Sequence, residues 1–176
     1  YQHMLQEAVA EAKAGAAGGD TAAAESWSPQ INLGTPVLIP EVYVPDLGVR
    51  LSLYRRLAEM DTAEDLEAFA AEMVDRFGPL PREVENLMEV MTIKQLCRRA
   101  GVEKLEAGPK GAVVTFRNNA FANPEGLVQY IGKQAGTVKL RPDHKLVIQR
   151  GWETEQQRLA GARRVLEELV QVAAGG

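Results

Sequence analysis

The sequence has 176 residues, of which 45% are hydrophobic and 25% are charged, a balance that is typical of globular proteins and argues against extensive disorder. The net charge of −4 argues against a strongly basic nucleic-acid-binding protein, and a single cysteine excludes an internal disulfide. No apolar run approaches the ~20 residues of a membrane span, so we expect a cytoplasmic protein.

Residues 1–13 are predicted to form a helix, because their apolar side chains recur at helical spacing. The chain begins at Tyr1 inside this pattern without an initiator methionine, and we therefore expect a fragment of a longer protein. Residues 15–28 are small, polar and without periodicity, which is typical of a flexible linker. These features predict a domain boundary near Ser28, with the main domain over residues 29–176.

An extended stretch is predicted over residues 31–39, and the prolines at positions 36, 40 and 45 are expected to keep it at a sheet edge. Asp46 and Thr62 are well placed to cap two helices, the first ending at Ala58. In the second helix, apolar side chains form one core-facing stripe: Leu66, Phe69, Ala70, Met73 and Phe77. Gly78, in the left-handed helical conformation, and Pro79 are expected to end this helix.

The next helix is predicted to begin at Pro81 and to reach Ala100, followed by Gly101. Its apolar side chains fall on two nearly opposite faces before and after Thr92. This pattern predicts a helix that is either buried on two sides or broken near Thr92.

Beyond residue 101 the period of the pattern changes to that of strands. Four strands are predicted, over residues 102–106, 112–116, 137–140 and 145–148. One helix is predicted to start at Asn123-Pro124, and a long final helix is predicted after the capping residue Thr154. The sequence therefore predicts an α+β fold: helices in the first half, a small antiparallel or mixed sheet in the second half, and a long C-terminal helix.

The two halves also differ in charge. Residues 57–90 contain ten acidic side chains and two basic ones. On the helix over residues 63–76, Asp65, Ala68, Glu72, Asp75 and Arg76 share the face opposite the core stripe. Two interpretations remain open: an ordinary solvated surface with a Glu72–Arg76 pair, or a docking surface for a partner that carries arginines, which the small Ala68 would allow to approach closely.

Residues 133–164 contain eight basic side chains and three acidic ones. Seven basic residues of the second half could contact phosphates: Lys139, Arg141, Lys145, Arg150, Arg158, Arg163 and Arg164. An auxiliary DNA-binding module is therefore an alternative function, although a solvated face explains the same residues.

The sequence carries no pattern for catalysis, cofactor binding or metal binding. The phosphate-binding Gly-x-x-x-x-Gly-Lys-Ser/Thr arrangement is missing, and Gly132-Lys133-Gln134 is a weak approach to it. Cys97, His3 and His144 are too few and too widely spaced for a closed metal site, and Cys97 is expected to be a buried apolar residue. We therefore predict that this chain is not an enzyme, and a cryptic hydrolase is the third and weakest interpretation.

Several segments resemble the carboxy-terminal domain of the bacterial transcription-repair coupling factor (Mfd). The first is residues 72–81, Glu-Met-Val-Asp-Arg-Phe-Gly-Pro-Leu-Pro, and others are 36–40, Pro-Val-Leu-Ile-Pro, and 43–46, Tyr-Val-Pro-Asp. Residues 50–57, Arg-Leu-Ser-Leu-Tyr-Arg-Arg-Leu, also match. Residues 1–5, Tyr-Gln-His-Met-Leu, are similar to the end of the translocase motor of that family. The segments follow one another in the family's order.

The resemblance implies a function that the residue patterns alone do not show. The family's parent protein is an ATP-dependent double-stranded DNA translocase that displaces stalled RNA polymerase and recruits the excision-repair protein UvrA. Its carboxy-terminal domain is expected to dock on the UvrA-binding module of the same protein and to mask it. By resemblance, the docking residues correspond to Glu72, Asp75 and Arg76, with Asp65 on the same face. ATP and magnesium would bind to the parent's motor, so no cofactor is expected in this chain.

Overall fold

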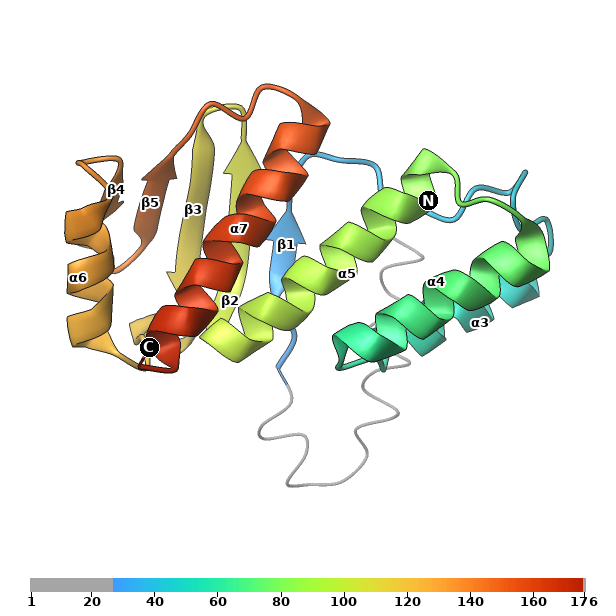
Figure 1. Ribbon diagram of the computed structural model, residues 1–176, viewed down its shortest axis with the longest axis horizontal. Coiled ribbons are helices and arrows are strands. Elements are labelled where there is room, and N and C mark those ends of the chain that lie inside the picture. The colour runs from blue at the N-terminus through green and yellow to red at the C-terminus, as the bar shows by residue number, and fades with distance from the viewer. Residues whose placement is uncertain (1–26, 176) are drawn as a thin grey trace. The chain divides into compact units, whose positions relative to one another are not determined.

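The computed structural model describes residues 27–175 (Figure 1). The predicted helix over residues 1–13 and most of the predicted linker over residues 15–28 lie outside the described residues. The described residues divide into two compact units. The first contains Trp27 with Pro36–Met91, and the second contains Ser28–Thr35 with the chain from Thr92 onward.

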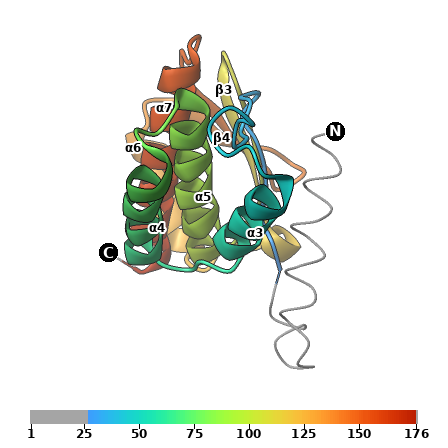
Figure 2. The ribbon, with the colours of Figure 1, turned by 90° about the vertical axis from the view of Figure 1, so that its right-hand side faces the viewer.

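The first unit is built on a helical hairpin of α3 (Leu47–Ala58) and α4 (Ala63–Phe77) (Figure 2). Both predicted N-caps are confirmed. A side-chain oxygen of Asp46 accepts a hydrogen bond from the Val49 N–H at 2.9 Å, and the Thr62 hydroxyl accepts one from the Asp65 N–H at 3.1 Å. These contacts satisfy amide donors that a helix start leaves without a backbone partner.

The predicted stripe of α4 lies in the core of the first unit. Leu66, Phe69 and Met73 are buried there, whereas Ala70 and Phe77 are partly buried. The other buried residues of this core are Ile39, Val44, Leu53, Tyr54, Leu57, Val84 and Leu87. Because this stripe is buried in the core, the opposite face of α4 is the one that can contact solvent or another protein.

The C-terminal end of α4 is held by Tyr43, which precedes α3 in the chain. The Tyr43 hydroxyl contacts the carbonyl oxygens of Met73 and Gly78 at 3.1 and 2.8 Å. Gly78 ends the helix as predicted, but its φ of 96° and ψ of −172° lie outside the left-handed helical region that we expected. This extended conformation with positive φ is accessible to glycine because it has no Cβ.

Helix α5 (Arg82–Ala100) is continuous, and the break that was one of two expectations near Thr92 does not occur. Val84 and Ile93, from the two predicted faces, are both 0% exposed. The division between the units falls after Met91, so the two halves of this helix are assigned to different units.

The second unit contains a five-stranded sheet with the strand order β1-β2-β3-β5-β4. Its strands are β1 (Gln30–Asn32), β2 (Val102–Gly108), β3 (Gly111–Phe116), β4 (Val138–Leu140) and β5 (Leu146–Gln149). A 3₁₀ turn, η1 (Arg117–Asn119), follows β3. Strand β1 is parallel to β2, whereas the other neighbours are antiparallel. The predicted α+β fold with a mixed sheet is confirmed, although the extended stretch expected over residues 31–39 supplies a strand of three residues at the sheet edge.

Helices α6 (Pro124–Lys133) and α7 (Glu155–Ala173) lie together on one side of this sheet (Figures 1 and 2). The Tyr130 hydroxyl donates to the Glu168 carboxylate at 2.9 Å, which joins the two helices. Thr154 caps α7 as predicted, and the Gln157 side chain accepts in return from the Thr154 N–H at 3.0 Å. None of the helices within residues 27–175 has both the length and the apolar character of a membrane span.

Candidate functional site

The outward surface of α4 is the candidate site, and we call its five residues the acidic face: Asp65, Ala68, Glu72, Asp75 and Arg76. Four of them are exposed, and Glu72 is partly buried. The arrangement follows from the helix itself, because burial of the apolar stripe in the core turns the opposite side chains toward solvent. The sequence placed these five residues on one surface, and the structure keeps them there.

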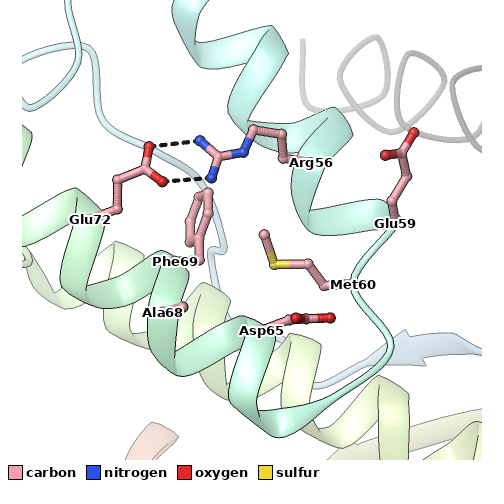
Figure 3. A pocket seen from close by; sticks show the side chains of 7 residues that line it. All are labelled: Arg56, Glu59, Met60, Asp65, Ala68, Phe69 and Glu72. Atoms are coloured by element: carbon pink, nitrogen blue, oxygen red, sulfur yellow. Dashed lines mark hydrogen bonds and ion pairs between the residues drawn. The ribbon is translucent and has the colours of Figure 1, made fainter.

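Glu72 is held by two arginines. Both of its carboxylate oxygens accept hydrogen bonds from Arg56 of α3, at 2.7 and 2.6 Å (Figure 3). One of these oxygens also accepts a hydrogen bond from Arg76 at 3.0 Å. The hydrogen bonds from Arg56, and to a smaller extent the one from Arg76, lower the pKa of Glu72 to about 2. Glu72 is therefore an ionised carboxylate at neutral pH whose two oxygens are already engaged.

The Arg76 contact is the i,i+4 pair that helical spacing predicted. Arg56 is a residue of this site that the sequence reasoning missed. Its partner lies sixteen positions away, on another helix, and no periodicity within one helix could identify it. The guanidinium carbon of Arg56 also lies 5.3 Å from the centroid of the Phe69 ring.

Asp65 and Asp75 differ from Glu72 in their contacts. Within residues 27–175, neither carboxylate takes part in a hydrogen bond or an ion pair. The interaction of Asp65 with Thr62 uses the Asp65 backbone N–H, so that its carboxylate remains accessible. These two carboxylates can therefore accept hydrogen bonds from a partner without first breaking a contact to any of the described residues.

An open groove lies beside Glu72, between the end of α3 and the first turns of α4 (Figure 3). Met60 and Phe69 contribute apolar surface to it, and Ala68 lies along the α4 side between Asp65 and Glu72. A long side chain with an apolar stem and a cationic end matches these surroundings.

Of the seven basic side chains singled out in the second half, four contact oxygens of the chain itself, whereas Lys139, Lys145 and Arg164 make no such contact among the described residues. Arg141 pairs with Asp143, and a nitrogen of Arg163 lies 4.0 Å from a Glu167 oxygen. Arg150 donates to the Gln134 side chain at 3.0 Å and to the Thr137 hydroxyl at 2.9 Å.

Arg158 has a structural role in the second unit. It donates at 3.0 Å to the Leu33 carbonyl, just after β1, and at 3.4 Å to the Trp152 carbonyl. Together with the pairs above, these hydrogen bonds engage four of the seven basic side chains with the chain's own oxygens.

Among the described residues, the other side chains that could act as nucleophiles or metal ligands, Cys97 and His144, have no surroundings that favour either role. Cys97 is fully buried, and burial raises the pKa of its thiol to about 12, so it is protonated and unreactive at neutral pH. His144 is exposed in the turn between β4 and β5. In the described part of the chain, no three His, Cys, Asp or Glu side chains lie together in a way that could hold a metal ion.

Comparison with protein families finds a match between residues 33–127 and the family described as the TRCF domain. This segment covers more than half of the chain, and it includes α3, α4, α5 and the acidic face.

Similar curated proteins are transcription-repair-coupling factors. The one from Rickettsia bellii is 37% identical over 148 residues, which are 84% of this chain and 13% of the relative. The one from Escherichia coli K12 is 30% identical over 169 residues, which are 96% of this chain and 15% of the relative. The chain therefore spans about one seventh of the length of these relatives.

A solved structure, the crystal structure of the C-terminal domain of a transcription-repair coupling factor, has a similar fold. The TM-score is 0.70 at 18% sequence identity, and the similarity covers 85% of this chain and 96% of the solved one. At 18% sequence identity, this similarity shows that the two chains share a fold.

Proposed function

This chain belongs to the TRCF domain family, and from that premise we propose that it is an autoinhibitory, regulatory domain that works by contact with another protein surface. It docks on the UvrA-binding module of the same parent protein and masks it. The parent is an ATP-dependent double-stranded DNA translocase that displaces stalled RNA polymerase and recruits nucleotide excision repair. Residues 1–28 are the end of the translocase motor with a linker, and residues 29–176 are the regulatory domain.

One observation carries this proposal: α4 displays three carboxylates on the surface opposite its buried stripe, and two of them, Asp65 and Asp75, are accessible and uncommitted within the described residues. Arginines on a facing surface would pair with these carboxylates through charge-assisted hydrogen bonds. Arg76 lies between Glu72 and the Phe77 ring, 4.8 Å from its centroid, and is placed to meet a carboxylate of the partner.

A masking domain must also release its partner. An exposed contact built on charges suits this requirement, because such pairs are individually weak and are screened by salt. UvrA can bind only the modules that the domain leaves uncovered. The apparent affinity of the module for UvrA therefore equals its intrinsic affinity multiplied by the uncovered fraction.

The direct test is a titration of the isolated UvrA-binding module with this chain, followed by calorimetry. The wild-type chain is expected to bind, and the double variant Glu72→Lys with Asp75→Lys is expected to bind at least about tenfold more weakly, because it replaces attraction with repulsion. Binding of the wild type is also expected to weaken as salt is added.

A charge-matched control separates a local effect from a change in net charge. Glu125→Lys with Glu153→Lys alters the charge by the same amount at two exposed positions of the second unit and should leave binding intact. Equal binding by the wild type and the α4 double variant would show that the acidic face is not the docking surface.

A further inference from the structure

Glu72 already has a bidentate arginine partner inside this chain. The two nitrogens at the end of Arg56 donate to its two carboxylate oxygens at 2.7 and 2.6 Å (Figure 3). This fork-to-fork arrangement is the one that a partner's arginine would adopt on the same carboxylate. We infer that Arg56 is an internal competitor: it occupies on Glu72 the position of a partner's arginine and thereby weakens docking on the acidic face. This inference rests on the proposed docking function and adds to it the means of its regulation.

The Arg56–Glu72 pair can be exchanged because it lies near the surface. The Arg56 side chain is 40% exposed and that of Glu72 is 35% exposed. Ion pairs with this degree of exposure contribute little to stability, since water competes for both groups. Arg56 would not become isolated on leaving Glu72, because its guanidinium already lies over the Phe69 ring at 5.3 Å.

The surroundings of Glu72 leave a path for the incoming side chain. Arg56 reaches the carboxylate from α3, whereas the groove runs along α4 past Ala68 toward Asp65 (Figure 3). A guanidinium that enters past the small Ala68 side chain therefore reaches Glu72 next to Arg56, which lines the same groove, and must displace Arg56 to bind both oxygens. Arg76 remains bound to one oxygen of Glu72 at 3.0 Å, so the carboxylate stays in place during the exchange.

Competition of this kind has a quantitative consequence. A partner can use both oxygens of Glu72 only in the fraction of molecules in which Arg56 has moved away, and its apparent affinity equals the intrinsic affinity multiplied by that fraction. Removal of Arg56 should therefore strengthen docking, even though it removes a contact from the folded domain.

The experiment compares affinities for the isolated UvrA-binding module, used as the probe. Arg56→Gln is expected to bind about two- to fivefold more tightly than the wild type, which corresponds to the usual worth of an exposed ion pair. Arg56→Lys keeps the positive charge but cannot occupy both oxygens in the planar fork, so it should also bind more tightly, by a smaller factor.

Arg55→Gln is the matched control. Arg55 is the next residue of α3, is exposed, and makes no ion pair or side-chain hydrogen bond within the described part of the chain. Its replacement removes the same charge from the same helix, and little change in affinity is expected. An equal gain for Arg55→Gln and Arg56→Gln, or no gain for Arg56→Gln in a chain with a wild-type circular dichroism spectrum, overturns the inference.

A second measurement does not depend on the partner. In a carbon-13 NMR titration, the Glu72 carboxyl is expected to titrate at higher pH in Arg56→Gln than in the wild type, and still below its ordinary range because Arg76 remains. An unchanged titration would show that Arg56 does not hold Glu72. If Glu72 responds as expected and no variant binds the module, the proposed docking function fails and the internal competition has no partner to act on. If the wild type binds and Arg56→Gln binds no better, docking stands and the competition is excluded.

Discussion

At the scale of single residues, Gly161 leaves room for the indole ring of Trp152 against α7. A Cβ added at Gly161 would lie 2.2–2.5 Å from three atoms of that ring, far closer than van der Waals contact. Trp152 is buried, so the ring cannot move aside without disturbing its neighbours. The lack of a side chain at this position is therefore a packing requirement of the second unit.

We predict that Gly161→Ala destabilises the protein, by about 1–3 kcal/mol of overpacking before any gain in helix propensity. Gly132→Ala is the control, because it is expected to change the free energy of unfolding in the opposite direction. Gly132 lies in α6 with nothing within 4 Å of its added Cβ, so alanine there should stabilise by up to about 1 kcal/mol. Urea unfolding of both variants checks the pair, and a stabilising Gly161→Ala would show that the ring can relocate cheaply.

At the scale of elements, the Arg56–Glu72 pair joins α3 to α4 and makes their contact sensitive to acid. The pKa of Glu72 is about 2 in the folded chain, below its ordinary value of 4.5. A carboxyl group with a lowered folded pKa stabilises the fold above its unfolded pKa, and this contribution disappears as the pH falls through the folded pKa. The pair should therefore contribute fully above about pH 4.5 and progressively less toward pH 2.

The corresponding prediction compares the wild type with Glu72→Gln in urea unfolding. At pH 7 the wild type should be more stable, by no more than about 1 kcal/mol because the pair is exposed. The difference should shrink as the pH approaches 2. Asp75→Asn serves as a control, since the Asp75 carboxylate has no partner among the described residues and its loss should have little effect on stability. A difference for Glu72→Gln that persists undiminished in acid would contradict the assignment.

The elements also show which features of the fold the sequence could predict. Caps and stripes depend on neighbours a few positions apart, and for this reason Asp46, Thr62 and Thr154 were identified correctly, as was the stripe of α4. The parallel pairing of Gln30 with Lys104 could not be predicted, because it joins distant segments and β1 has only three residues. The anchoring of α4 by the Tyr43 hydroxyl has the same long-range character.

In the candidate site too, contacts within one helix could be predicted from the sequence, whereas contacts between helices could not. The acidic face followed from helical periodicity, including the contact between Glu72 and Arg76. The role of Arg56 did not, because it depends on how α3 packs against α4. The assignment of the face to docking came from family resemblance and stays a prediction until binding is measured.

At the scale of the whole molecule, the net charge is −4, and several arginines of the basic second half are bound to the chain's own oxygens. Counterion release by free cations is the main source of sequence-independent DNA affinity. A chain with this charge distribution should be a poor ligand for a duplex.

We therefore predict that the chain does not retard a short double-stranded DNA in a mobility-shift assay at about 0.15 M salt. Any weak retention at low salt should be unaffected by Arg163→Glu with Arg164→Glu. A specific loss of retention in that double variant would instead support the auxiliary DNA-binding module.

The connectivity of the second unit bears on how the protein is made. Its edge strand β1 leaves the ribosome before the helices of the first unit, whereas β2, to which it pairs, follows them. The helical hairpin can acquire its core from nearby residues while translation continues, but β1 must wait for its neighbour to be synthesised. A nascent chain that stalls after Met91 would therefore contain a helical unit that can fold and a β1 segment that still lacks its pairing partner.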